Sequence, residues 1–174
     1  MRTKLLNYSL NNIDDLIKYL EDYRDSLDDK CDLFVRRLAE IGLPIIDERE
    51  AAAKGDGAQG YNKSYMKVET VGKGVFVAKL IYEGTDVLFI EFGAGVHYNG
   101  NPESSPHPKG VEMGYTIGNY SDKHKGLQDS WFYRDEAGSL ERSFGTEATM
   151  PMYHASQKII ENIRKIAKQV FGGR

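Results

Sequence analysis

The 174-residue chain has very little cysteine and no long apolar run. Its single cysteine, Cys31, excludes a disulfide within one chain and gives no sign of an oxidising compartment. No stretch approaches the roughly 18 consecutive apolar residues of a membrane-spanning helix. The N-terminal sequence MRTKLLNYSLNN also lacks the apolar core of a signal peptide. We therefore expect a soluble protein that is made in the cytoplasm and does not contact a membrane.

The sequence also has few motifs that are typical of catalytic or ligand-binding sites. There is no G-x-S-x-G motif, and the glycine-rich segments GDGAQG (55–60) and GAGVHYNG (93–100) lack the lysine or the helix of a phosphate-binding loop. Three histidines, His97, His107 and His124, lie in one segment, but at intervals of ten and seventeen residues rather than at zinc-ligand spacing. We expect no enzyme, no cofactor and no metal. A small metal-assisted hydrolase that uses the His97–His124 loop and Glu91 is the alternative.

The net charge of −3 hides an asymmetry along the chain. Residues 12–30 carry seven acids and three bases, a net of −4, whereas residues 155–174 carry five bases and one acid, a net of +4. These segments are either solvated helix faces or the two ends of a charge dipole that favours head-to-tail stacking of identical subunits. The basic end has no interleaved aromatic residues and no arginine cluster, so we expect no specific nucleic-acid binding. A toxin-like or nucleic-acid-binding module that uses the basic C-terminal helix is the third hypothesis.

Helical periodicity is clear at both ends of the chain. After an arm at 1–10, apolar residues at intervals of three, four or seven predict a long helix over 11–42, with Gly42 and Pro44 as its stop. A short helix that leads into a glycine-rich loop is expected next. A second apolar stripe predicts a C-terminal helix over 150–171, with Pro151 in its first turn.

The sequence of the middle of the chain predicts β-strands. Three short β-rich runs with tight turns predict an antiparallel meander over 65–92, whose last strand, Val87 to Phe92, has Glu91 facing solvent or pairing with a base on a neighbouring strand. A long glycine- and proline-rich loop over 93–129 and a hairpin over 130–144, with Trp131 as its core anchor, follow. The fold predicted for 1–174 is therefore one α+β domain, an antiparallel sheet packed by the two helices.

Two short motifs carry a resemblance. The first is IEFGAG (90–95), a glutamate and an aromatic residue followed by Gly-x-Gly, and the second places Gly145, Pro151, Met152, Tyr153 and Ala155 at the entry of the last helix. Together with the order of the elements, they resemble the head–tail connector and tail-completion proteins of long-tailed bacteriophages and prophages. The chain departs from that pattern in having Ala94 where threonine is common, and in the length of its loop at 96–129.

The resemblance implies a structural, non-enzymatic protein of the virion that is synthesised in the cytoplasm of the bacterial host. Such proteins form ring homo-oligomers, typically hexamers, and contact neck and tail-tube proteins. Whether the role is that of a neck adaptor or of a tail terminator stays open. The residues expected to serve assembly lie at the strand end, in the loop and at the helix entry: Glu91, Phe92, Gly93, Gly95, Tyr98, Tyr115, Tyr120, Pro151, Met152 and Tyr153.

Overall fold

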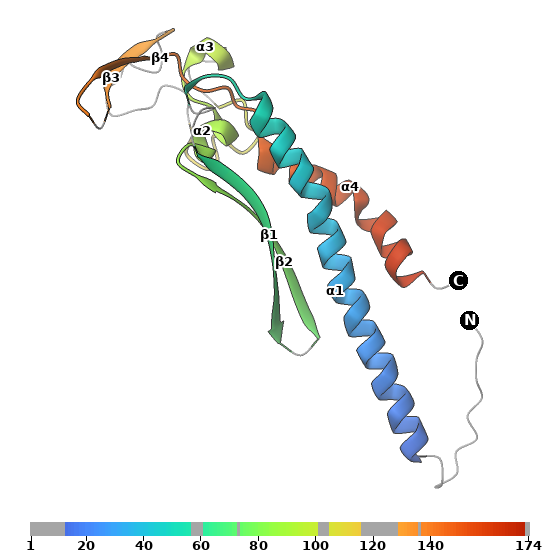
Figure 1. Ribbon diagram of the computed structural model, residues 1–174. Helices are drawn as coiled ribbons and strands as arrows, with labels where there is room; N and C mark the ends of the chain where they lie inside the picture. The colour runs from blue at the N-terminus through green and yellow to red at the C-terminus, as the bar shows by residue number, and fades with distance from the viewer. Residues whose placement is uncertain are drawn as a thin grey trace.

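The computed structural model describes residues 13–56, 61–72, 74–100, 105–115, 129–135 and 137–172. It confirms the α+β class, with a long N-terminal helix, a C-terminal helix and two small antiparallel sheets (Figure 1). The elements in chain order are α1 (Ile13–Ala52), β1 (Asn62–Gly72), β2 (Val75–Gly84), α2 (Val87–Phe92), α3 (Val96–Asn99), β3 (Trp131–Arg134), β4 (Leu140–Ser143) and α4 (Pro151–Phe171).

Helix α1 is longer than the sequence predicts. It runs for 40 residues to Ala52 and passes through Gly42 and Pro44, so the predicted end at 42 is wrong. Gly42 does not end the helix because it is a packing site: a Cβ there would lie within 3.0 Å of the side chains of Leu80 and Ile159. Pro44 is exposed, and the helix continues beyond it to bury Ile46 completely. Burial of that second apolar turn outweighs the hydrogen bond that the proline removes.

Strands β1 and β2 form an antiparallel hairpin, with Tyr65 opposite Ile81 and a register shift between Thr70 and Gly72. The predicted third strand of a meander is wrong, because Val87–Phe92 forms the short helix α2. The apolar residues of this segment favour a strand. In a strand, however, Glu91 would point away from Ile90 and Phe92. A helical turn buries all three consecutive residues, as the structure shows.

The segment predicted as a loop over 93–129 is partly structured. It contains α3 and a series of turns at 106–114, while 101–104 and 116–128 lie outside the described residues. The hairpin predicted over 130–144 is confirmed, since β3 and β4 pair with Trp131 opposite Ser143. Trp131 packs against Gly95, where a Cβ would come within 2.7 Å of its ring. The predicted C-terminal helix is confirmed as α4.

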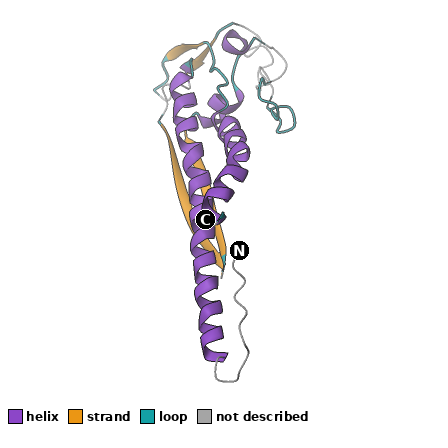
Figure 2. Ribbon diagram, turned by 90° about the vertical axis from the view of Figure 1, so that its right-hand side faces the viewer, coloured by secondary structure: helices purple, strands orange, loops and turns teal. Residues whose placement is uncertain are grey.

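The core lies where α1 meets the β1–β2 hairpin on one side and α4 on the other (Figures 1 and 2). Ala155 of α4 is fully buried, and its Cβ lies 3.6 Å from the position that a Cβ of Gly42 would take. At the C-terminal end of α4, the ring of Phe171 meets Phe34 at 5.5 Å. The N-terminal part of α1 projects past this point, away from α4 (Figure 1). The molecule thus has a packed end, which holds α2, α3 and β3–β4, and a protruding helical end.

Candidate functional site

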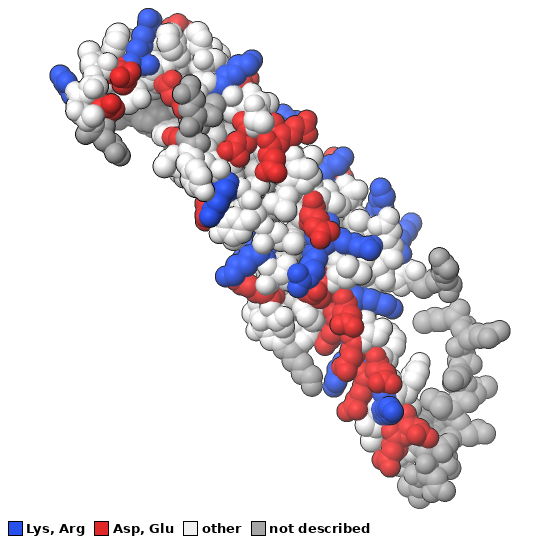
Figure 3. Space-filling view, in the orientation of Figure 1, with Lys and Arg blue, Asp and Glu red and all other residues white. Residues whose placement is uncertain are grey.

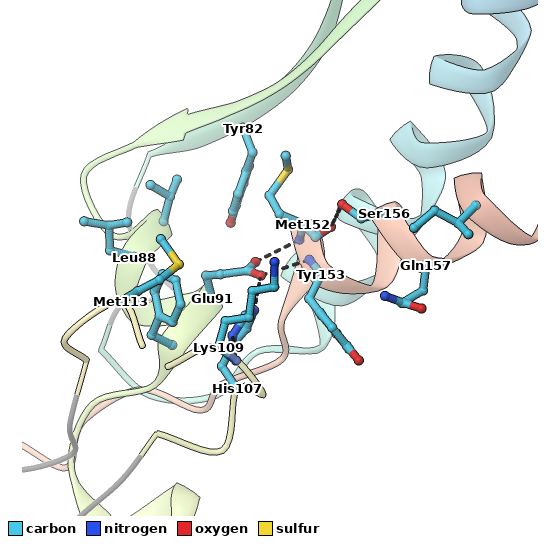
Figure 4. A pocket seen from close by; sticks show the side chains of 13 residues that line it. Tyr82, Leu88, Glu91, His107, Lys109, Met113, Met152, Tyr153, Ser156 and Gln157 are labelled. Atoms are coloured by element: carbon cyan, nitrogen blue, oxygen red, sulfur yellow. Dashed lines mark hydrogen bonds and ion pairs between the residues drawn. The ribbon is translucent and has the colours of Figure 1, made fainter. Parts of the chain in front are cut away.

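Glu91 joins α2 to the start of α4. Its side chain is nearly fully buried, and its two carboxylate oxygens accept the backbone N–H groups of Met152 at 2.8 Å and Tyr153 at 2.9 Å (Figure 4). Helix α4 needs this acceptor because Met150, at its N-cap, has no side chain that can cap, and Pro151 follows it. A carboxylate at this position also interacts favourably with the helix dipole. Glu91 is therefore the N-terminal cap of α4, supplied from another helix.

His107 completes the contacts of Glu91. Its Nε2 lies 3.1 Å from a carboxylate oxygen of Glu91, and its Nδ1 accepts the backbone N–H of Lys109 at 3.0 Å. Because Nδ1 accepts a hydrogen bond, we assign the ring proton to Nε2, from which it is donated to Glu91. The ring is 7% exposed and lies against the rings of Phe92 and Tyr153. Both nitrogens of His107 thus have partners within the chain.

The turns at 105–115 are tied to α2 by two further contacts. The buried Ser105 hydroxyl donates a hydrogen bond to the carbonyl of Phe92. Tyr115 stacks on the ring of Phe92, with ring centroids 4.0 Å apart. This part of the predicted loop therefore belongs to the packed end of the molecule.

Asn99 fastens the segment that follows α2. Its side-chain amide donates to the carbonyls of Gly95 at 3.0 Å and Thr146 at 2.8 Å, and its oxygen accepts the N–H of Ala148 at 2.9 Å. Gly93 and Gly95 have φ angles of +81° and +72°, which residues other than glycine rarely adopt. The close neighbours that require these glycines belong to the same chain, since a Cβ at Gly93 would meet Asn99 at 2.8 Å.

A pocket of about 430 Å³ opens beside this junction. Glu91 and His107 line the pocket together with the half-buried Met152 and Tyr153, toward which the carboxylate of Glu91 points (Figure 4). The lining of the pocket is mainly apolar. Tyr82 is one of its residues; burial raises the pKa of this tyrosine, and its hydroxyl has no hydrogen-bond partner among the described residues. Such a pocket suits an apolar side chain.

The histidines that the sequence grouped together have separate partners. His97 pairs with Asp129 at 2.6 Å near the surface, whereas His107 is buried against Glu91. His124 lies outside the described residues. In the described part of the chain, no three His, Cys, Asp or Glu side chains converge in a way that could hold a metal ion.

Apart from Gly93 and Gly95, which have positive φ angles in the segment after α2, the residues predicted for assembly fall into three groups. Glu91, Phe92, Pro151, Met152 and Tyr153 do meet at one junction, but the predicted orientation of Glu91 is wrong, because it is buried rather than facing solvent or a base across a strand. Tyr98 lies against His97, and Tyr115 is used inside the chain. Tyr120 lies outside the described residues.

Sequence reasoning grouped Glu91 with the His97–His124 loop only as a hydrolase site, and it missed His107, Ser105 and Asn99 as structural partners of this junction. One signal was available for Glu91: α4 begins with Met-Pro and has no Ser, Thr, Asp or Asn at its N-cap. A helix without its own cap requires an acceptor from elsewhere, and Glu91 is the one acid among the apolar residues 87–92.

No protein-family model, curated protein or solved structure matches the chain significantly. Among the described residues, no helix is long and apolar enough to cross a membrane.

Proposed function

We propose that the chain is a structural protein of long-tailed bacteriophages that assembles as a ring, with a hexamer as the expected stoichiometry, at the junction of head and tail. The observation that carries this proposal is the carboxylate of Glu91 on the N–H groups of Met152 and Tyr153. The two motifs that resemble connector and tail-completion proteins are distant in sequence, and here they form one hydrogen-bonded unit. Their residues have a structural reason to occur together.

The same contacts argue against the alternative, a metal-assisted hydrolase. A general acid or base needs a proton site that faces the substrate. The oxygens of Glu91 accept three hydrogen bonds, and both nitrogens of His107 are engaged. The role of these groups in the chain is to hold α4, α2 and the 105–115 turns together.

Surfaces suited to assembly lie elsewhere on the molecule. The N-terminal half of α1, which protrudes past the end of α4, carries exposed apolar residues, including Ile17 at 49% and Leu20 at 54% exposure. Each strand of the β1–β2 hairpin has one edge without a strand partner among the described residues. Neighbouring copies, and the neck and tail-tube proteins of the virion, are the proposed occupants of these surfaces. Synthesis takes place in the host cytoplasm.

Particle assembly tests the proposal directly. Deletion of the gene from a producing prophage is expected to yield separate heads and tails, and the purified protein is expected to form rings on isolated heads or tails in electron micrographs. Complementation with the wild-type gene restores joined particles. Infective particles from the deletion strain would contradict the proposal.

A further inference from the structure

The apolar stripe of α1 is covered along only part of its length. It has the spacing of three or four residues that is typical of a helix–helix seam: Ile13, Leu16, Leu20, Tyr23, Leu27, Cys31, Phe34, Leu38, Ile41 and Ile45. From Phe34 onward the stripe lies against α4 and the hairpin. The part from Ile13 to Leu27, which we call the free seam, is exposed except at the half-buried Leu16, with 46% exposure at Ile13 and 41% at Leu27.

A second seam is exposed on α4. Ile160 is 60% exposed and Ile163 is 40% exposed, and both lie on the helix face that continues through Ala167 to Phe171, whose ring also meets Phe34 of the same chain and is 38% exposed. We call this face the α4 seam. Ile160 also lines the pocket beside Glu91, so the seam begins at a hollow that can receive an apolar side chain.

The helical segments that carry the two seams have opposite net charge. Residues 13–30 hold seven acids and three bases, a net of −4, whereas residues 151–171 hold four bases and one acid, a net of +3. Ile17, which is 49% exposed, widens the free seam on one side, and the exposed Asp14 and Glu21 lie three residues before and four residues after it, just beyond that edge. Arg164 and Lys168 are exposed beside Ile160 and Phe171. Figure 3 shows the acidic side chains along the protruding half of α1 and the basic ones over α4.

We infer that the free seam of one copy packs on the α4 seam of the next copy, head to tail; this inference rests on the proposed ring. The spacing of the free seam calls for a helix as its occupant. The length also fits, since 13–27 spans about 21 Å and 160–171 about 16 Å at 1.5 Å per residue. A symmetric pairing of two free seams would instead bring two segments of net −4 together. Because the two seams differ, the contact is heterologous and generates a ring when the rotation closes.

A charge-reversal experiment on the full chain tests the contact. The variant D14K/E21K makes the edge of the free seam basic, and R164E/K168E makes the edge of the α4 seam acidic. Each variant alone is expected to self-associate at least about tenfold more weakly than the wild type in sedimentation velocity, because like charges then face each other. An equimolar mixture of the two is expected to associate again, since each supplies the seam that the other lacks.

Matched controls lie on the opposite faces of the same helices. D22K/D29K and K158E/K165E change the net charge by the same amounts, at exposed sites on the side of each helix that faces away from its seam. Both controls are expected to associate like the wild type. Circular dichroism and the melting temperature establish that every variant is folded, and the mixture separates a lost contact from a lost fold.

Each other outcome overturns the inference in a different way. Full association of both reversed variants would remove this contact and leave the ring proposal intact. D14K/E21K could lose self-association without regaining it in the mixture. That result would mean that residues 1–12, a second free seam or another protein covers the free seam. Absence of wild-type association, both in solution and on phage particles, would overturn the ring proposal together with this contact.

Discussion

At the scale of single residues, Glu91 is the decisive side chain of the packed end. A buried carboxylate is unfavourable unless hydrogen bonds compensate its lost hydration, and here two backbone N–H groups and one imidazole do so. The same contacts satisfy N–H groups of α4 that its own sequence leaves without an acceptor. One residue therefore stabilises α2, α4 and the turn that carries His107.

Replacement of Glu91 is expected to lower stability strongly. Glu91→Ala leaves two N–H groups and His107 without an acceptor, and the free energy of unfolding should fall by about 3 kcal/mol or more. Glu91→Gln keeps one acceptor oxygen and should cost less, about 1–3 kcal/mol. Urea denaturation measures both values, with the exposed Glu112→Ala as a control expected within about 0.5 kcal/mol of the wild type. Equal stability of Glu91→Ala and the wild type would contradict the capping role.

At the scale of elements, two prolines in helices have different consequences. Pro44 lies inside α1, where it cannot donate to the carbonyl of Glu40, and its side chain is exposed. Pro151 occupies the first turn of α4, where no N–H is required, and it is fully buried. The first proline costs helix stability, whereas the second fits its site.

Alanine at these two positions is expected to change stability in opposite directions. Pro44→Ala restores a main-chain hydrogen bond and should raise the free energy of unfolding by about 1–2 kcal/mol, after allowance for the greater freedom of the unfolded chain. Pro151→Ala should lower it by about 1–2 kcal/mol, because a buried ring is lost. Thermal and urea denaturation provide both values. A less stable Pro44→Ala variant would show that α1 requires the proline for its packing.

At the scale of the whole molecule, stability is concentrated at one end. The C-terminal half of α1 is packed between the hairpin and α4, whereas the free seam extends beyond the end of α4 (Figure 1). An isolated helical segment of about 15 residues is only marginally stable in water. The protruding end therefore needs a partner to become as rigid as the packed end.

Hydrogen exchange is expected to report this difference. In the monomer, amides of residues 16–27 should exchange at least about tenfold faster than amides of residues 38–50, because they open without unfolding the core. On assembly, protection should rise chiefly in residues 16–27 and along α4. Equal protection of both halves of α1 in a protein shown to be monomeric would contradict this distribution.

Local chemistry in the sequence was sufficient for the α+β class, for both terminal helices, for the β1–β2 hairpin and for the β3–β4 hairpin. Their apolar periodicities and glycine turns act over a few residues. Three features depended on tertiary packing instead: the continuation of α1 past Pro44, the helical form of Val87–Phe92 and the burial of Glu91. The free energy gained by burying Ile46 outweighs the cost of Pro44 within α1. The burial of Ile90, Glu91 and Phe92 in α2 outweighs the strand propensity of this segment. The acceptor that α4 lacks comes from a residue about sixty positions away. The missing cap of α4 is visible in its own sequence, but the residue that supplies the acceptor is not, so only the folded chain decides the partner.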